Sequence, residues 1–375
     1  MTQGAEVPAD NGEQYHGDAV SLRTGTTISG MDYLEKVISF EALYESMLKC
    51  KKGVLWKEST ASFYLNGVER VLKLEQQLRD GTYKARPPRQ FKVMHPKERE
   101  IISIAFCDRV FQRSLNDNVI YPQLSKSFIY DNMACQKGKG TDKARDRLEC
   151  FMQKSYRKNG RNAYVLQCDI KGYYPNMRHE VAKAVFQSKL DPRIFAMASE
   201  VLDGQYAGEV GFNPGSQMVQ ICGISVLDKL DHYIKEQLRI KYYIRYMDDL
   251  ILIHNDQEYL QRCRDIIRGE LNSMGMDYNE KKTRIYPITR GIKFLGFIFR
   301  LSETGKVYRQ IDPKNVKAER KKLARMAALV KKGELTREKV DACYGSWRAH
   351  ASKGNSYHLL KRMDKFYKEL WRSKT

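Results

Sequence analysis

The sequence predicts an α+β fold in which helices cover one face of an antiparallel sheet. In the middle of the chain, apolar spacing alternates in the order strand, helix, strand–turn–strand, helix, strand. Residues 241–254 place two β-forming runs on either side of a tight turn, which favours an antiparallel hairpin. No apolar run approaches the roughly 20 residues of a membrane span, and the N-terminus lacks the basic-then-apolar pattern of a signal peptide.

The N-terminal part is predicted to be mainly helical. Residues 1–30 lack periodicity and are predicted to be a disordered tail. Helical spacing predicts one helix over 40–53 and a second over 60–81, each ending at a glycine. The alternating segment 83–106 predicts a β-hairpin with the connection HPKERE, and 108–124 returns to helical spacing.

The central part carries the strands. A short apolar strand starting at Tyr164 ends on Asp169. Ser216 is a predicted N-cap for a long helix that runs to about residue 238. After the hairpin, 256–275 is predicted to be a helix and 293–299 a last strand.

Charge indicates a polyanionic partner. The 375 residues carry a net charge of +21, which favours nucleic acid over a merely basic surface. Residues 1–30 hold four acidic residues and one arginine, whereas 301–375 hold 20 basic and eight acidic residues. The C-terminal part is therefore expected to grip the polyanion. The eight cysteines are scattered without a CxxC pair, which predicts a reducing cytosol rather than a zinc ribbon or disulfide framework.

Two adjacent carboxylates interrupt the predicted hairpin. Asp248 and Asp249 lie between apolar runs, where like charges repel and a partly buried carboxylate resists ionisation. A solvated turn is one explanation. The other is a divalent cation such as Mg²⁺, which prefers hard oxygen ligands. With Asp169 as third carboxylate, two strand ends could hold two Mg²⁺ roughly 4 Å apart, the arrangement for in-line phosphoryl transfer.

At this point the motifs resemble a known family. The YMDD of the hairpin and an upstream DIKGYY resemble the palm of reverse transcriptases, and the resemblance covers roughly residues 35–375. Four further motifs follow in the family's order: KEREIISIAFCDRVFQ, GSQMVQ, MGMDYNEKKT and KFLGFIF. The resemblance implies an RNA-directed DNA polymerase with a right-hand fold. Its predicted parts are fingers at 31–160, a palm at 161–300 with a fingers insertion near 181–205, and a basic helical thumb at 301–375.

The resemblance also implies roles for single residues. Asp169, Asp248 and Asp249 would bind two Mg²⁺, which Mn²⁺ can replace, with Ile170 beside Asp169 at the metal site. Tyr174 would be the steric gate that excludes a ribose 2′-hydroxyl and so favours dNTPs. The alternative is that Tyr174 is one more core aromatic residue.

Other implied residues contact substrates. Lys97 and Arg99 would bind the incoming triphosphate, unless they form an exposed basic turn. Lys282 would protonate the pyrophosphate leaving group, or is a solvated turn lysine. Ser216 and Gln217 would border the templating base and the dNTP. The basic C-terminal helices would contact the phosphates of an RNA–DNA duplex, or form a solvated bundle.

The SQ motif predicts the type of biological system in which the enzyme acts. Ser216 followed by Gln217 resembles the SQ motif of diversity-generating retroelement enzymes, although Gly211 lies five residues before Ser216 instead of four. A bacterial or phage-encoded cytoplasmic enzyme of that type is expected, with a specific non-coding RNA and a small basic accessory protein. The alternatives are an antiphage-defence reverse transcriptase, a catalytically silent RNA-binding protein on the same fold, and an RNA polymerase or terminal transferase.

Overall fold

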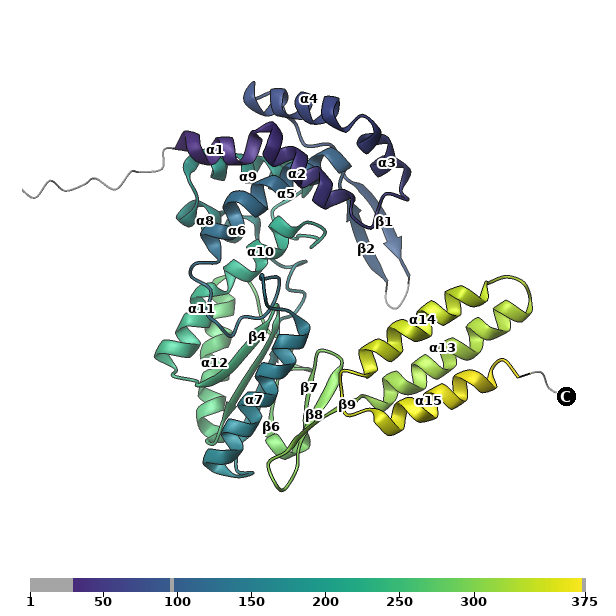
Figure 1. Ribbon diagram of the computed structural model, residues 1–375. Coiled ribbons are helices and arrows are strands. Elements are labelled where there is room, and N and C mark those ends of the chain that lie inside the picture. The colour runs from purple at the N-terminus through teal and green to yellow at the C-terminus, as the bar shows by residue number, and fades with distance from the viewer. Residues whose placement is uncertain (1–29, 95–97, 373–375) are drawn as a thin grey trace, which may run out of the picture.

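The computed structural model describes residues 30–94 and 98–372 (Figure 1). The tail predicted at residues 1–30 lies outside the described residues except for Gly30, at which α1 begins. The N-terminal elements are α1 (Gly30–Ile38), α2 (Phe40–Lys51), α3 (Glu58–Leu65), α4 (Gly67–Arg79), β1 (Arg89–Val93) and β2 (Arg99–Ser103). The predicted helix over 40–53 and the predicted hairpin are confirmed by α2 and the β1–β2 pair.

The single helix predicted over 60–81 is wrong, because the chain breaks between α3 and α4. Asn66 leaves helical geometry with φ −109° and ψ 36°. Gly67 lies close to α2, where a Cβ would come 3.0 Å from the Met47 Sδ. The break therefore lets α4 pack against α2, and its apolar face supplies buried Val71, Leu74 and Leu78.

A run of helices links the hairpin to the main sheet. The elements are α5 (Phe106–Leu115), the π-helical turn η1 (Asn116–Ile120), α6 (Tyr121–Leu124), α7 (Thr141–Asn159), α8 (His179–Lys189) and α9 (Pro192–Gln205). The first three are continuous and confirm the helix predicted over 108–124. The last two follow the first strand of the main sheet, in the segment predicted as an insertion.

The main sheet has four antiparallel strands in the order β4-β5-β3-β6. Its strands are β3 (Tyr164–Asp169), β4 (Tyr242–Tyr246), β5 (Asp249–His254) and β6 (Arg284–Pro287). The predicted strand–turn–strand at 241–254 is thus confirmed as β4 and β5.

Helices lie on both faces of this sheet, which is a difference from the predicted single face. The helices of one face are α10 (Gln217–Val226), α11 (Asp228–His232), the π turn η2 (Tyr233–Gln237) and α12 (Gln257–Ser273). Leu166 and Leu252 point to that side, in one core with α10 and α12. Their neighbours Val165 and Ile253 point to the other side, where α7 packs. The α+β class is confirmed, and the period-2 alternation explains why a strand between two layers is apolar throughout.

Two helical predictions in this region differ in detail from the structure. Ser216 caps α10 as predicted, because its Oγ accepts a hydrogen bond from the Val219 amide at 3.2 Å. The long helix predicted to residue 238 is instead broken at Leu227, which has φ −92° and ψ 7°. The predicted helix at 256–275 is confirmed by α12.

A second sheet completes the other face. It is antiparallel in the order β7-β8-β9, with β7 (Ile292–Phe294), β8 (Phe297–Leu301) and β9 (Val307–Ile311). The single strand predicted at 293–299 is wrong, because Leu295 and Gly296 turn the chain with φ of 45° and 87°. Phe294 and Phe297 pair across this turn and both enter the core.

Three helices end the chain as a separate bundle, which we call the C-terminal bundle. They are α13 (Pro313–Lys331), α14 (Arg337–Ala351) and α15 (Tyr357–Glu369). Leu323, Val340, Tyr344 and Met363 form its own small core. In Figure 1 the β1–β2 hairpin extends toward this bundle across the open side of the molecule. No helix among the described residues has the length and apolar character needed to cross a membrane. The predicted subdomain limits stay predictions.

Candidate active site

The two strands that carry the predicted carboxylates end side by side. In the β3–β5 ladder Asp169 is the register partner of Asp249. Both residues lie at the same end of the sheet because β3 stops where β5 begins. Gln167, two residues earlier on β3, donates from Nε2 to Asp249 Oδ1 at 3.3 Å and to the Lys293 carbonyl at 2.9 Å. Tyr286 of β6 in turn donates to Gln167 Oε1 at 3.0 Å, so the amide that orients Asp249 is itself fixed.

The turn before Asp249 is strained, and hydrogen bonds from Arg245 and Ile170 hold it in place. Met247 has φ of 56°, a left-handed conformation that costs a side-chain-bearing residue about 1–2 kcal/mol. Arg245 Nη1 donates to the Met247 carbonyl at 3.0 Å. The Asp248 carbonyl accepts from the Ile170 amide at 3.3 Å, which ties the turn to the end of β3.

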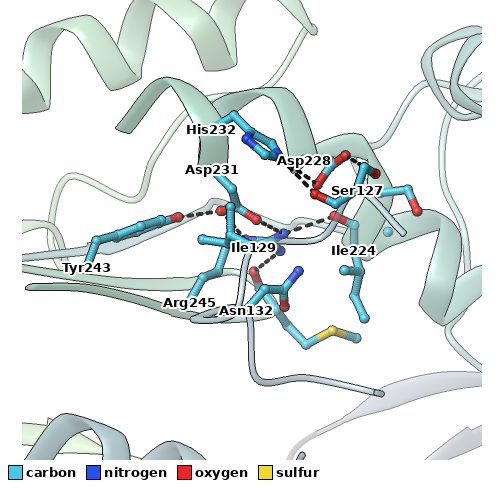
Figure 2. Close-up of polar contacts among 12 residues, drawn as sticks. Ser127, Ile129, Asn132, Ile224, Asp228, Asp231, His232, Tyr243 and Arg245 are labelled. Carbon is cyan, nitrogen blue, oxygen red and sulfur yellow. Dashed lines mark hydrogen bonds and ion pairs between the residues drawn. The ribbon is translucent and has the colours of Figure 1, made fainter. Parts of the chain in front are cut away.

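Arg245 is fixed by a buried ion pair. Its side chain and that of Asp231 are both 0% exposed, and two bonds of 2.7 and 2.5 Å join them. Figure 2 shows Tyr243 and Arg245 converging on Asp231, with Tyr243 OH donating at 2.6 Å and Arg245 also reaching the Ile224 carbonyl at 3.0 Å. All the acceptors around this guanidinium come from α10, α11 and the turn. The network therefore links the turn that carries Asp248 to the helices packed against the sheet.

Burial and neighbouring charge raise the pKa values of Asp248 and Asp249. Burial raises the pKa of Asp249 to about 7, and the charges of Asp248 and Asp169 add to the shift. Burial also raises the pKa of Asp248, again with a contribution from Asp169. Each shift means that the folded chain disfavours the ionised form, since the charge is desolvated and lies near like charges. A bound cation would reverse both effects.

In the chain alone, a lysine supplies part of that positive charge. Lys282 Nζ lies 2.9 Å from each carboxylate oxygen of Asp169. The turn that carries Lys282 is anchored to the same residue, because the Asn279 amide donates to the Asp169 carbonyl at 2.6 Å. The Lys282 side chain is still 62% exposed and so has room to move away.

A basic cavity opens at these carboxylates. It has a volume of about 370 Å³, and Gln167, Asp169 and Asp249 line its sheet side. The lining also includes six cationic side chains, those of Lys281, Lys282, Arg284, Arg290, Lys293 and Arg300. We call it the carboxylate cavity. A cavity with two carboxylates at one end and six cations around them suits a polyanion whose reacting end lies at the carboxylates.

Tyr174 lies on the other side of the turn. Its ring packs against α10, where a Cβ on Gly223 would come 2.7 Å from the Tyr174 hydroxyl oxygen. The same hydroxyl is 4.0 Å from Met247 Sδ. Burial raises the pKa of Tyr174, so the phenol stays protonated. The ring is therefore held between the Met247 turn and Gly223, where a Cβ would collide with it.

A match to a protein-family model identifies the family of this chain. The model described as "Reverse transcriptase (RNA-dependent DNA polymerase)" matches residues 95–299, which is more than half of the chain. The chain belongs to the reverse transcriptase family. The match spans the main sheet, both carboxylate strands and the first strands of the second sheet. The comparison with curated proteins gave no significant match.

Solved structures with a similar fold include telomerases. One from Candida albicans, in complex with the TWJ fragment of telomeric RNA, is 12% identical with a TM-score of 0.46, over 66% of this chain and 51% of the telomerase chain. One from Candida tropicalis, apo and truncated from its C-terminal domain, is 14% identical with a TM-score of 0.45, over 60% and 55%. Another apo form from that species is 15% identical with a TM-score of 0.44, over 61% and 49%. This reverse transcriptase thus spans about half the length of those chains.

Several predicted substrate residues lie elsewhere. Gln217, the first residue of α10, lines a separate cavity of about 290 Å³ together with Cys135 and Lys137. Ser216 is mostly buried and engaged as the α10 cap. Lys97 lies outside the described residues, and Arg99 begins β2 opposite Val93. The structure therefore gathers Asp169, Asp249 and Lys282 in one cavity, with Asp248 on the adjoining turn, whereas Ser216 and Gln217 do not line that cavity.

The donor set of this reverse transcriptase fits a hard cation. Within residues 30–94 and 98–372, no three His, Cys, Asp or Glu side chains are arranged to hold a metal ion. Asp169 instead faces Lys282, and the Ile170 side chain is 1% exposed. Three carboxylates at two adjoining strand ends, two of them with raised pKa values, are nevertheless a set of oxygen ligands whose charge Mg²⁺ would neutralise.

Sequence reasoning missed Gln167, Arg245 and most of the cavity cations. Gln167 and Arg245 sit inside strand motifs, where a polar residue gives no sign of its partner. Arg284 lies on β6 of the main sheet, Arg290 just before β7, and Arg300 on β8 of the second sheet. Only the tertiary fold, which packs these elements around one cavity, brings the three arginines together.

Proposed function

We propose that this chain is an RNA-directed DNA polymerase that adds dNTPs to a primer 3′-hydroxyl by two-metal phosphoryl transfer. The observation that carries the proposal is the register pairing of Asp169 with Asp249 at the head of a basic cavity. Family membership supports the reaction class, and the geometry supports the residues that we propose for it.

The carboxylates would hold the metal ions. Asp169, Asp248 and Asp249 provide oxygen ligands from two strand ends, with the Ile170 backbone beside them. Mg²⁺ held by these residues would lower the pKa of an attacking hydroxyl and would neutralise charge on the pyrophosphate. Mn²⁺ can replace it because it also accepts hard oxygen ligands. Gln167 keeps Asp249 oriented, and Arg245 keeps the turn in its left-handed conformation.

Other residues would handle the nucleotide. Tyr174 would exclude the 2′-hydroxyl of an rNTP, since its ring cannot retreat into α10 at Gly223. Lys282 would turn from Asp169 toward the leaving pyrophosphate once cations neutralise that carboxylate. Lys97 and Arg99 would bind the triphosphate, and Ser216 and Gln217 would border the templating base.

The duplex would lie against positive charge. The carboxylate cavity offers six cations beside the reacting end, and residues 301–375 add a net charge of +12. Contacts of this kind bind phosphates without reading sequence, so affinity for an RNA–DNA duplex should fall steeply with salt.

Primer extension on an RNA template tests the activity. Wild type with dNTPs and Mg²⁺ should extend a DNA primer, and Asp249→Asn should not. Asp265→Asn is a matched control, because Asp265 is exposed on α12 and outside the carboxylate cavity. Equal extension by wild type and Asp249→Asn would refute the proposal. Duplex binding without extension by wild type would support the alternative of a silent RNA-binding protein.

The setting we propose is a diversity-generating-retroelement-like system with a specific non-coding RNA and a small basic accessory protein, in a bacterial or phage-encoded context. The support is the Ser216–Gln217 pair at the start of α10. A near-identical template and variable repeat beside the gene would agree with it, whereas a cluster of defence genes would favour an antiphage role.

A further inference from the structure

A second cavity lies in the C-terminal bundle, apart from the carboxylates. It has a volume of about 660 Å³ and opens between β9, α13 and the start of α15. No residue lines both this cavity and the carboxylate cavity. In Figure 1, α14 is the bundle helix toward the β1–β2 hairpin, and α15 lies on the side away from it. We call this cavity the bundle pocket.

The bundle pocket is cationic without any acidic residue. Lys317, Arg320 and Lys321 of α13 and Arg362 of α15 line it, and none of its lining residues is Asp or Glu. In the described part of the chain these four cations form no ion pair. Other bundle cations do have acidic partners, as Arg348 has Asp364 at 3.0 Å and Arg337 has Asp341 at 3.4 Å. The four charges repel one another and remain available to an anion.

The neighbouring acid is also engaged. Asp312 caps α13 by accepting from the Lys314 amide at 2.9 Å and pairs with Lys293 at 2.7 Å. Lys293 belongs to the carboxylate cavity. Asp312 therefore faces the catalytic side and leaves the charge of the bundle pocket unopposed.

The start of α15 adds a polar group without a partner. Ser356 is the N-cap of this 13-residue helix, and its side chain makes no capping bond. The residue is 4% exposed, and its Oγ has no hydrogen-bond partner in the described structure. Buried hydroxyls are normally satisfied, and the first amides of a helix favour an anion. Both features add to the cations on the same wall.

The floor of the bundle pocket is apolar. Ile311, Pro313, Val316 and Leu359 line it. Inorganic phosphate needs only the cations, whereas a ligand that carries both a phosphate and a flat, weakly polar ring uses both surfaces. A nucleotide has this combination.

We propose that the bundle pocket binds a nucleotide of single-stranded nucleic acid, with its phosphate on the four cations and its base on the apolar floor. The choice of nucleic acid over a free nucleotide rests on the proposed function, because a reverse transcriptase already binds a nucleic-acid strand as its template. The pocket would hold a strand segment outside the duplex and so keep template RNA near the active site between turnovers.

Equilibrium binding to a labelled single-stranded RNA of about 12 nucleotides tests the inference. Lys317→Gln/Lys321→Gln removes two pocket cations. Lys365→Gln/Lys368→Gln removes the same charge from exposed positions on α15 outside the pocket. We expect the pocket pair to weaken binding about fivefold or more and the matched pair less than about twofold, because only the pocket contacts are specific. Equal losses would overturn the proposal, since they would indicate a general charge effect.

Two further arms separate the sources of binding. An oligomer of abasic nucleotides of equal length keeps the phosphates and removes the bases, so wild type should bind it more weakly than RNA, and the pocket pair should lose that preference. Competition by free AMP as well as by RNA would identify a mononucleotide site and overturn the strand proposal. Arg362→Gln, on the other helix, should repeat the loss seen with the pocket pair. Primer extension on a pre-annealed duplex reports on the proposed function separately, because it does not need the single-strand contact.

Discussion

Arg245 and Asp231 form an ion pair with two hydrogen bonds, and neither side chain is exposed to solvent. A third bond from the same guanidinium reaches the Met247 carbonyl, in the turn that leads to the carboxylates of Asp248 and Asp249. A buried pair of this kind contributes little net stability, but losing one partner is costly. Its value here is positional, because it fixes the carbonyl of a residue with positive φ.

The first prediction concerns Arg245→Met. The change leaves Asp231 buried and unpaired, and we expect unfolding to become easier by about 3–5 kcal/mol, measured by urea denaturation. Arg264→Met is the control, because its exposed pair with Asp265 should contribute less than about 1 kcal/mol. The double variant Arg245→Met/Asp231→Leu should regain much of the stability but little primer extension, since the Met247 carbonyl is still not held. Full recovery of extension would refute the positional role.

The second prediction concerns Asp249→Asn without metal. Burial and neighbouring carboxylates raise the pKa of Asp249 to about 7, so its charge opposes folding at neutral pH. A neutral side chain of the same shape should raise the melting temperature in EDTA by a few degrees, on the order of 4–8 °C per kcal/mol for a small domain and less for this larger chain. Adding Mg²⁺ should stabilise wild type more than the variant, so the difference between their melting temperatures should become smaller. A lower melting temperature for the variant in EDTA would contradict this account.

The sequence predicted the parts of this site that local pattern encodes. Asp248 and Asp249 stood out because charges rarely interrupt an apolar hairpin, and Asp169 because it ends a strand. Their meeting depends on strand order, and the family resemblance supplied it before the β3–β5 pairing did. Lys282 was expected at the leaving group, yet in the chain alone it binds Asp169.

The errors have physical causes. The helix predicted over 60–81 is broken because Gly67 must approach Met47, a contact that no periodicity reveals. The strand predicted over 293–299 is a hairpin because two residues with positive φ reverse it. In both cases the spacing of the apolar residues does not reveal the interruption, and tertiary packing decides where the chain turns.

The third prediction concerns the ring of Tyr174. Tyr174→Val should raise the use of rNTPs relative to dNTPs, because the 2′-hydroxyl gains room. Gly223→Ala should act on the same ring from behind, since its Cβ would lie 2.7 Å from the hydroxyl oxygen. We expect a higher KM for dNTPs in steady-state extension. Gly269→Ala is the control, because a Cβ there meets nothing within 4 Å. This change should only stabilise α12, by up to about 1 kcal/mol, through the higher helix propensity of alanine. An unchanged rNTP to dNTP ratio in Tyr174→Val would refute the gate.

The fourth prediction uses two histidines whose pKa values move in opposite directions. Burial lowers the pKa of His350, with further lowering by Arg145 and Lys353 that exceeds the opposing effect of Asp142. The folded chain therefore keeps His350 neutral while the unfolded chain protonates it. This dependence makes the stability of wild type fall as pH drops below about 6.5. His350→Gln removes this dependence. The melting temperature of the variant relative to wild type should therefore increase as the pH is lowered from about 8 to about 5.

His232 supplies the opposite sign. Its hydrogen bonds to Glu236 and to the Ser127 carbonyl raise its pKa. The protonated form is favoured in the folded chain, so the stabilisation is present below about pH 6.5 and is lost as pH rises through the raised value. His232→Gln should therefore lose more melting temperature at about pH 5 than at about pH 8, the reverse of His350→Gln. Parallel shifts in the two variants would show that neither histidine controls the pH dependence, because a change common to both must come from groups outside these two contacts.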